Sequence, residues 1–322
     1  MLSGSPQTGA DLGKRLRARD LSAAPAALNL IESFAPSDRE QARELLSAVS
    51  PAALGGEAAG HIVGVTGPPG AGKSTLLSAL LHTWRDEGKS VAMLAVDPSS
   101  RRSGGSLLGD RARIDFDPAD KGVLIRSTAA GDRLGGLAPA TRTAAQALAA
   151  AFDIVVIETV GVGQAETEVA DVADTVSVVV QPGSGDVLQF LKSGIMETPD
   201  VLVVTKADLG DLALQTRRDL SAALRSLGAR ETKVVAVCSL PPTCGIEELV
   251  DALEQHRLRA NIAERRTCAR RAGALLDFAA EHGERGLRAL GGRREAEKLL
   301  ATQDPSLDGQ ALVATLEEAA RA

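Results

Sequence analysis

The pattern of hydrophobic and polar positions divides the 322-residue chain into three regions, of which the first and the last show helical spacing and the middle one contains short apolar runs. In the first region apolar residues recur at helical intervals between breaks, and helices are expected over 9–20, 25–35 and 37–49. Ser37 and Glu40 have the S-x-x-E spacing of a capping box, which predicts that Ser37 caps the last of these helices. The stretch 51–60 is expected to be a linker.

The second region, from residue 61, consists of short apolar runs separated by longer amphipathic stretches. Several runs are apolar on both faces, which is typical of parallel strands buried between helices. We therefore expect an α/β fold with a mostly parallel sheet covered by helices on both faces. Ligands of such sheets bind at the carboxyl ends of the strands. The predicted strands are 61–66, 90–96, 122–126, 153–159, 175–180, 200–205 and 233–238.

The third region, after about residue 246, shows only helical patterns and gathers six arginines: Arg257, Arg259, Arg265, Arg266, Arg270 and Arg271. A solvated helix face is the favoured interpretation of this cluster, and a partner-docking arm is the alternative. The predicted domains are an N-terminal helical extension (1–58), a central sheet domain (59–255) and a C-terminal helical region (256–322). The last of these is a candidate dimerisation or partner arm.

Composition narrows the possible partners. Hydrophobic residues make up 44% of the chain and charged residues 24%, ordinary values that exclude wholesale disorder. Aromatic residues are only 2% and the formal charge is -6, so a nucleic-acid partner is not expected. No apolar run is long enough for a signal peptide or a membrane span, and the three cysteines and four histidines lack zinc-site spacing. We expect a cytoplasmic protein without disulfides.

The first strand runs directly into GPPGAGKST, and an apolar helical pattern follows. This is the G-x-x-x-x-G-K-[ST] phosphate-binding loop in the strand–loop–helix context that it requires. Its glycines let backbone N–H groups close around a β-phosphate, Lys73 bridges the β- and γ-phosphates, and the Ser74 hydroxyl binds Mg²⁺. The predicted nucleotide-binding residues here are Gly67, Pro68, Pro69, Gly70, Ala71, Gly72, Lys73, Ser74 and Thr75.

A candidate switch follows the fourth strand, in the sequence IETVGVGQAE. Glu158 leaves a buried strand beside the phosphate loop, where its carboxylate can hold the Mg²⁺ shell; a purely structural glutamate is the alternative. Gly161 is placed to offer its N–H to the γ-phosphate. Gln164 is a candidate to orient the attacking water, and a surface glutamine is nearly as well supported.

The sixth strand ends in VVTKAD, and this motif predicts which nucleotide base the protein binds. The Asp208 carboxylate can accept hydrogen bonds from N1–H and the amino group of guanine, and adenine has no matching pair of donors. Lys206 would lie along the base, and Thr205 begins the motif. Downstream of a phosphate loop, T-K-x-D is strong evidence for GTP. Backbone N–H groups for the guanine O6 are expected after the last strand, at Cys238, Ser239 and Leu240.

Together these segments resemble the MeaB/ArgK group of SIMIBI-class P-loop GTPases, chaperones of cobalamin-dependent acyl-CoA mutases such as methylmalonyl-CoA mutase. The matching text spans roughly 61–210 and comprises GVTGPPGAGKST, VAMLAVDPSSRRSGGSLLGDRARI, FDIVVIETVGVGQAE and GDVLQFLKSGI. The resemblance implies a P-loop GTPase domain at 59–255, bound Mg²⁺ with GTP or GDP, a mutase partner and a homodimer. It also implies that Asp97 and Asp110 join Ser74 and Glu158 in the magnesium and switch region.

The chain departs from this family in three places. Its C-terminal region lacks the tryptophan-rich text of the family's dimerisation arm, and the other two departures lie in or beside the nucleotide motifs. Thr205 replaces the family's asparagine, which lowers the guanine preference only slightly because Rho-type GTPases also use T-K-x-D. The stretch 191–194 keeps Lys192 but not the second lysine of the family, next to the switch elements. The core motifs hold no evident arginine finger, so slow intrinsic hydrolysis is expected, with a partner supplying what is missing.

Two other functions stay open on the sequence alone. A metallochaperone GTPase that supplies nickel would need thiol or imidazole ligands, and none of the cysteines or histidines is motif-spaced. An ArgK-type ATPase or kinase of a transport system would transfer phosphate from ATP. Binding of GTP with mutase-stimulated turnover distinguishes the favoured function from both.

Overall fold

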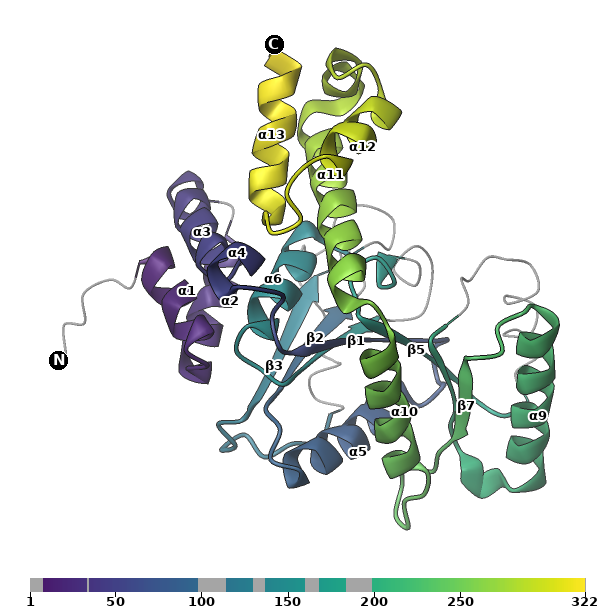
Figure 1. Cartoon of the computed structure of the whole chain (residues 1–322). Helices are drawn as coiled ribbons and strands as arrows, with labels where there is room; N and C mark the ends of the chain where they lie inside the picture. The colour runs from purple at the N-terminus through teal and green to yellow at the C-terminus, as the bar shows by residue number, and fades with distance from the viewer. Residues whose placement is uncertain are drawn as a thin grey trace, which may run out of the picture. The chain divides into compact units, whose positions relative to one another are not determined.

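The computed structural model describes residues 8–33, 35–97, 114–129, 137–159, 168–183 and 199–321 (Figure 1). The chain divides into two compact units, each with its own core. The sheet unit comprises 61–138 and 153–260, and the helical unit comprises 1–60, 139–152 and 261–322.

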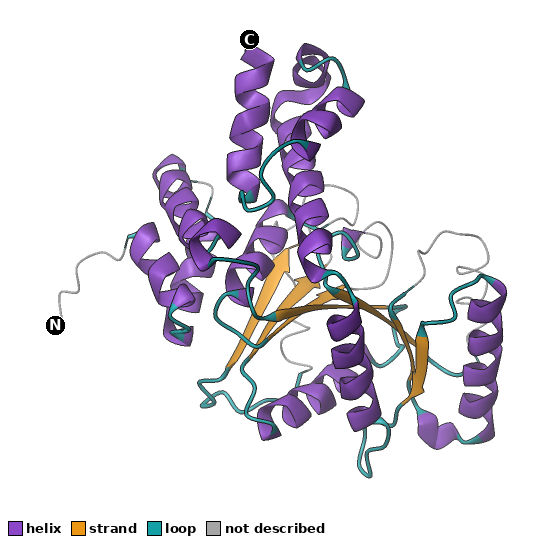
Figure 2. Cartoon of the chain, viewed as in Figure 1, coloured by secondary structure: helices purple, strands orange, loops and turns teal. Residues whose placement is uncertain are grey.

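The sheet unit is built on seven parallel strands in the order β3-β2-β4-β1-β5-β6-β7. All seven predicted strands are confirmed, with small shifts at their ends, and so is the α/β class. The strands, orange in Figure 2, are β1 (His61–Thr66), β2 (Val91–Asp97), β3 (Val123–Ala129), β4 (Ile154–Thr159), β5 (Thr175–Val180), β6 (Val201–Val204) and β7 (Lys233–Ala236).

Burial explains why these runs form a parallel sheet. β1, β4, β5 and β6 are buried at every position, as expected for Val- and Ile-rich strands with cover on both faces. Two helices, α5 (Lys73–Asp86) and α10 (Ile246–Arg259), contribute Trp84 and Leu249 to the core of this unit. The helix α9 (Asp211–Ser226) packs on β6 and β7. The phosphate loop and the base motif therefore project from one common scaffold.

The helical unit joins segments that lie far apart in the sequence. A Cβ at Gly9 would lie 1.7 Å from the Gln41 carbonyl oxygen, so this glycine lets the first and third helices touch. A separate core contains Phe278, Leu300 and Leu316. The division into three domains stays a prediction. The helices of this unit are α1 (Gly9–Arg17), α2 (Ala24–Ile31), α3 (Pro36–Ala48), α4 (Pro51–Leu54), α6 (Pro139–Ala149), α11 (Ile262–Ala289), α12 (Arg293–Ala301) and α13 (Gly309–Arg321).

The capping box predicted at Ser37 is wrong. The helix α3 begins one residue earlier, at Pro36, and its N-cap residue makes no side-chain capping bond. Proline suits the first position of a helix because it has no N–H to satisfy and its φ is already helical. Ser37 therefore lies inside the first turn, where its hydroxyl donates to Asp38 Oδ1 (3.2 Å).

The predicted linker after α3 contains a helix of its own. The Ser50 hydroxyl accepts a hydrogen bond from the Ala53 N–H (3.2 Å) and caps the short helix α4. Gly55 ends that helix in the left-handed conformation, with φ 77°, which glycine adopts without strain. The sequence S-P-A-A-L-G thus forms a short capped helix, although the composition of this stretch predicted a linker.

The arginine cluster is only partly a solvated face. Arg259 and Arg265 are exposed, whereas Arg266 and Arg270 are each only 5% exposed. The Arg266 guanidinium donates to the carbonyl oxygens of Ala58 (2.6 Å) and Gly60 (2.5 Å). Arg270 forms a salt bridge with Glu57 (2.7 Å). These two arginines fix the end of the N-terminal segment to α11, because their donors satisfy acceptors in a chain stretch with few apolar residues.

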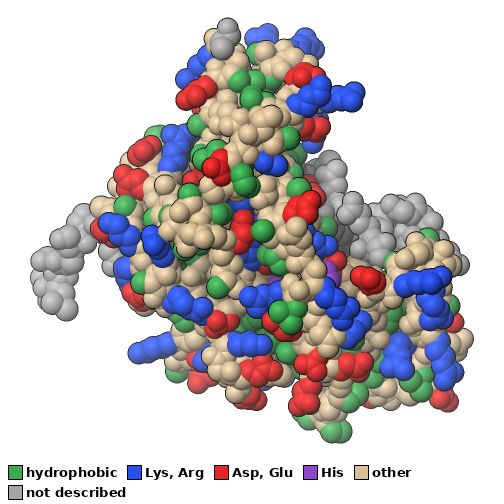
Figure 3. Space-filling model, in the orientation of Figure 1, with side chains coloured by type: hydrophobic (Ala, Val, Ile, Leu, Met, Phe, Trp, Pro, Cys, Tyr) green, Lys and Arg blue, Asp and Glu red, His purple; other side chains and the backbone are tan. Residues whose placement is uncertain are grey.

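The face of the molecule shown in Figure 3 carries no large patch of one charge on its described part. On the described part of the face in Figure 3, acidic and basic side chains are interspersed over both units. Among the described residues, none of the helices combines the length and the apolar composition that a membrane span requires.

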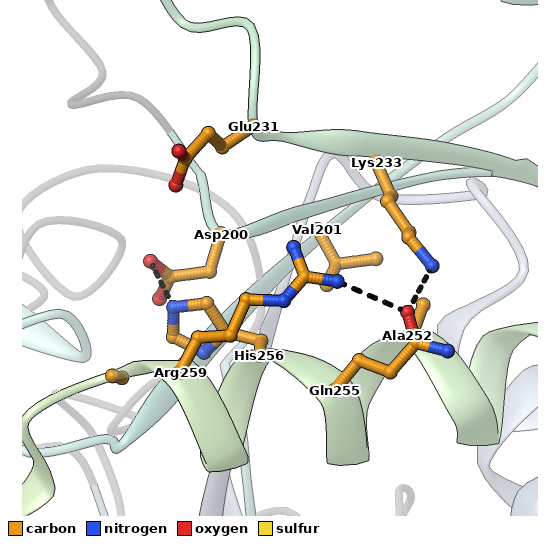
Figure 4. A pocket seen from close by; sticks show the side chains of 9 residues that line it. Asp200, Val201, Glu231, Lys233, Ala252, Gln255, His256 and Arg259 are labelled. Carbon is orange, nitrogen blue, oxygen red and sulfur yellow. Dashed lines mark hydrogen bonds and ion pairs between the residues drawn. The ribbon is translucent and has the colours of Figure 1, made fainter.

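A buried polar chain joins four side chains at the amino ends of the strands. His61 Nε2 and His256 Nδ1 each lie 2.8 Å from the Thr175 hydroxyl. His256 Nε2 lies 3.0 Å from the Asp200 carboxylate, on the wall of a cavity of about 120 Å³ (Figure 4). This chain ties β1 and β5 to α10 at the edge of the sheet opposite the phosphate loop.

We predict that Thr175→Val lowers the free energy of unfolding by about 1–3 kcal/mol, because the isosteric side chain cannot bond the two imidazoles that share its hydroxyl. Urea unfolding followed by circular dichroism measures the loss. Thr143→Val is the matched control, because the Thr143 hydroxyl donates only to Pro139 O in its own helix (3.0 Å). Its effect should stay below about 0.5 kcal/mol, and equal losses in the two variants would contradict the role of the network.

Candidate nucleotide-binding site

The predicted phosphate loop has the strand–loop–helix geometry that its sequence requires. β1 ends at Thr66, and α5 begins at Lys73. Three glycines in between have positive φ: Gly67 (141°), Gly70 (78°) and Gly72 (89°). A Cβ at Gly67 would lie 2.1 Å from the Val179 carbonyl oxygen, so a side chain there would separate the loop from β5. Among the described residues, no atom lies within 4 Å of a Cβ placed at Gly70.

The remaining loop residues divide into anchored and accessible positions. Ala71 is buried and its N–H donates to Pro68 O (3.2 Å), which closes the turn. Pro69 is exposed on the outer side of the loop, and Pro68 is half-buried. Thr75 is exposed in the first turn of α5, where its backbone N–H belongs to the amino end of the helix dipole.

The Lys73 ammonium folds back across the loop. The residue is only 8% exposed, and Nζ donates to Gly67 O (2.7 Å) and Pro68 O (3.3 Å). Both acceptors are neutral carbonyl groups of the loop itself. The loop therefore already concentrates positive charge, from this ammonium and from the amino end of α5, at the place where phosphate oxygens would bind.

Ser74 and Glu158 come together at the carboxyl end of the sheet. Parallel pairing of β1 with β4 places Glu158 opposite Val65, and its Oε1 accepts a hydrogen bond from Ser74 Oγ (3.2 Å). Glu158 is 7% exposed. A hydroxyl and a carboxylate are hard oxygen ligands of the kind that Mg²⁺ binds together with phosphate oxygens. The donor set present thus fits magnesium.

The other predicted metal and switch residues are only partly described. Asp97 is the last residue of β2 and pairs with Ala129 of β3, so its backbone lies on the strand next to β4. Its side chain lies outside the described residues. Asp110, Gly161 and Gln164 also lie outside them.

Thr205 contacts the phosphate loop, a link that the motif did not predict. Its hydroxyl lies 2.6 Å from Ala71 O and 3.0 Å from Val180 O, and the residue is 3% exposed. Lys206 follows with φ 54°, and its Nζ donates to Gln181 Oε1 (2.7 Å) and Gly70 O (3.4 Å). The start of the base motif is therefore hydrogen-bonded to the loop that would hold the phosphates.

Asp208 lies beside the loop that follows β7. It is exposed on a short 3₁₀ helix, η3 (Ala207–Leu209), which is tied to that loop by the Ala207 N–H to Val237 O bond (3.0 Å). Burial raises the pKa of the Cys238 thiol, and the neighbouring Asp208 carboxylate raises it further. The two segments predicted to bind the base are thus adjacent.

The segment after β7 that is predicted to bind the guanine O6, Cys238 to Leu240, contains a buried hydroxyl group. Ser239 Oγ is buried and, among the described residues, has no hydrogen-bond partner. A buried hydroxyl without a partner costs free energy that a ligand can recover. Leu240 next to it is 65% exposed, so the loop is accessible from solvent.

Sequence reasoning missed several residues that shape the site. The Gln181 side chain accepts a hydrogen bond from the Lys206 ammonium. At the ends of β1 and β4, the hydroxyls of Thr66 and Thr159 are hydrogen-bonded to each other (2.9 Å). A polar residue directly after a buried strand is the signal that could have found Gln181. Cys244, which pairs with Cys238 through two backbone hydrogen bonds, gave no local signal at all.

Comparison with known proteins identifies the family to which the chain belongs. Residues 5–282 match the family model described as methylmalonyl Co-A mutase-associated GTPase MeaB. A Pyrococcus abyssi protein named as a GTPase is 43% identical over 255 residues, which cover 77% of this chain and 75% of that protein. The Mus musculus protein named methylmalonic aciduria type A homolog, mitochondrial, is 38% identical over 254 residues, 73% of this chain and 60% of that protein.

One solved structure is similar over the full length of both chains. It is the crystal structure of a LAO/AO transport system kinase, with 27% sequence identity, a TM-score of 0.64 and coverage of 100% of each chain.

We predict that Lys73→Ala weakens binding of GTP with Mg²⁺ at least ~100-fold. The variant loses two charge-assisted hydrogen bonds to phosphate, each worth about 1.5–3 kcal/mol. Isothermal titration calorimetry measures the affinity. The matched control is Lys121→Ala, an exposed lysine in the turn before β3, which should bind as the wild type does. Retained affinity in Lys73→Ala would show that the triphosphate binds elsewhere.

Proposed function

Because the chain belongs to the methylmalonyl Co-A mutase-associated GTPase MeaB family, we propose that it hydrolyses GTP with Mg²⁺ and that its nucleotide state assists a cobalamin-dependent acyl-CoA mutase of the methylmalonyl-CoA mutase type. The observation that supports this most directly is the Ser74–Glu158 contact beside a glycine loop that ends in Lys73. A phosphate-binding loop with an adjacent hydroxyl–carboxylate pair is what a Mg²⁺-dependent nucleotide hydrolase needs.

The phosphate end of the site would work by positioning and charge. Lys73 would exchange its bonds to Gly67 and Pro68 carbonyls for stronger bonds to phosphate oxygens. Ser74 and Glu158 would hold the Mg²⁺ ion, with Asp97 and Asp110 as further proposed ligands. When bound, the ion neutralises negative charge on the β- and γ-phosphates. Gly161 and Gln164 keep their proposed roles toward the γ-phosphate and the attacking water.

The base end of the site would select guanine. Asp208 is exposed and adjacent to the loop that carries Cys238 and the unsatisfied Ser239 hydroxyl, so a flat base could lie between them. An adenine there would offer no pair of donors to the Asp208 carboxylate, and leaving this carboxylate without hydrogen bonds would weaken binding of the nucleotide. Thr205 would transmit the position of the base motif to the phosphate loop through its bond to Ala71 O.

The mutase is proposed as the partner on the strength of the family and of the name of the mouse relative. Any contact with cobalamin would be made through that partner, because the chain has no cobalamin ligand motif of its own. A homodimer is proposed from the family alone, and the cytoplasmic location stays the expectation drawn from the sequence. The nucleotide would gate cofactor loading or protection in the mutase, since occupancy of the γ-phosphate position is what distinguishes the two nucleotide states.

Of the two alternative functions, a kinase is favoured by one observation, whereas a nickel metallochaperone is poorly supported. A solved structure that is similar over its full length is that of a LAO/AO transport system kinase, which favours ATP-dependent phosphate transfer as the second candidate. For a nickel cargo, Glu281, His282 and Glu317 form one described group whose ligand atoms lie within 4.8 Å of one another. That group has one imidazole and no thiolate, and Glu281 and His282 are exposed, which suits a cargo site poorly.

The deciding experiment compares hydrolysis of GTP and ATP by the wild type and by Asp208→Asn, each with and without a methylmalonyl-CoA mutase. We predict selective, slow turnover of GTP by the wild type and stimulation by the mutase, because the partner supplies groups that the core motifs lack. Asp208→Asn should lose at least about tenfold in GTP preference, because its amide cannot accept both guanine donors.

Asp211→Asn is the matched control, because Asp211 begins α9 beyond the base motif and should leave the preference for GTP unchanged. Equal use of ATP and GTP by the wild type would defeat the base assignment. Transfer of phosphate from ATP to an acceptor would favour the kinase instead.

A further inference from the structure

Two of the three cysteines face each other across the loop that follows β7. Cys238 N–H donates to Cys244 O (2.9 Å), and Cys244 N–H donates to Cys238 O (3.0 Å), so the two residues form an antiparallel pair. Residues paired in this way have Cα atoms about 5.5 Å apart, with side chains on the same face. A disulfide requires a Cα separation of about 4.4–6.8 Å. The backbone therefore already holds these cysteines at a bonding separation.

The cysteine pair encloses the proposed base loop. Residues 239–243 lie between the two cysteines and include Ser239, whose buried hydroxyl has no hydrogen-bond partner in the described part of the chain. The Cys238 thiol donates a hydrogen bond to Leu240 O (3.2 Å), and the neighbouring Asp208 carboxylate contributes to the raised pKa of this thiol. A change at this sulfur therefore reaches both segments that would contact guanine.

The two thiols differ in accessibility. Cys244 is exposed, whereas Cys238 is 7% exposed and its thiol pKa is raised, mainly by burial. Since the thiolate is the reactive form, Cys244 is the thiol that a soluble oxidant reaches first. Cys238 is then the neighbour placed to resolve the oxidised sulfur. Cys268, the third cysteine, is exposed in the other compact unit and takes no part in this pair.

We propose that Cys238 and Cys244 form a reversible oxidation site, in which hydrogen peroxide converts the pair to a disulfide that closes the base loop and weakens guanine-nucleotide binding. The effect on binding rests on the proposed role of Asp208, whereas the disulfide itself does not. The site makes nucleotide binding sensitive to the redox state of the surroundings.

The chemistry takes two balanced steps. The Cys244 thiolate attacks one peroxide oxygen, forms an S–O bond and releases hydroxide, which gives a sulfenic acid. The Cys238 sulfur then attacks the Cys244 sulfur and displaces the hydroxyl, which leaves as water with the thiol proton of Cys238. Both sulfurs are oxidised and the peroxide oxygens are reduced. A dithiol reductant reverses the reaction by thiol–disulfide exchange.

Disulfide formation would change the base site in two ways. Cys238 Sγ would lose its proton and move toward Cys244, which breaks its hydrogen bond to Leu240 O inside the proposed base loop. The loop between the cysteines would become a covalently closed ring, which restricts the positions its backbone N–H groups can take. Both changes oppose the arrangement proposed to hold a guanine base.

The test treats the full-length protein with hydrogen peroxide and measures free thiols, intact mass and GDP affinity. We expect the number of free thiols to fall from three to one, the mass to fall by about 2 Da, and GDP binding to weaken at least about tenfold. A dithiol reductant should restore the thiol count, the mass and the GDP affinity to their original values. Peptide mapping should identify a Cys238–Cys244 link.

Two variants sharpen the result. Cys244→Ala should bind GDP as the untreated wild type does and should keep that affinity after peroxide, while Cys268→Ser should remain sensitive. A treated wild type that keeps its thiols, or that forms the link and binds GDP as before, would overturn the proposal. Failure of the reduced protein to bind GDP or GTP would instead refute the proposed function, and the mass and thiol measurements would still decide the disulfide.

Discussion

Parallel pairing of β1 with β4 and β5 is the constraint on which the rest of the structure depends. Because parallel strands end at one edge of a sheet, this pairing sets Glu158 at the same level as Val65, one residue before the end of the strand that leads into the phosphate loop. Ser74, in the first turn of the following helix, then falls within hydrogen-bonding distance of that carboxylate. Two residues 84 positions apart in the sequence are thus brought together by the pairing of the strands that precede or carry them.

The order of the strands also places the predicted base motif beside the phosphate loop. β6 lies beyond β5, so the residue after it, Thr205, reaches the loop from the other side and bonds Ala71 O. The pairing of β6 with β7 brings Asp208 next to Cys238. The predicted base motif and the phosphate loop are therefore hydrogen-bonded to each other, through the buried Thr205 hydroxyl and through the Lys206 ammonium. At the opposite edge of the sheet, Thr175 and two histidines fix the strands to α10.

Sequence periodicity predicted the sheet because continuous Val and Ile runs leave few alternatives, and the phosphate loop because its spacing is specific. It failed at Ser37, where Pro36 starts the helix, and at Arg266 and Arg270, whose charge suggested solvent. Their burial depends on acceptors more than 200 positions away, which no local pattern records. The Cys238–Cys244 pairing is a tertiary outcome of the same kind.

A crystal structure of the protein with Mg²⁺ and a non-hydrolysable GTP analogue tests the proposed nucleotide site most directly. We predict the γ-phosphate beside the Lys73 ammonium, Mg²⁺ in contact with Ser74 Oγ and held by the Glu158 carboxylate directly or through one water, and the guanine edge on Asp208. A nucleotide bound away from the glycine loop, or a Glu158 carboxylate turned away from the metal, would contradict this arrangement.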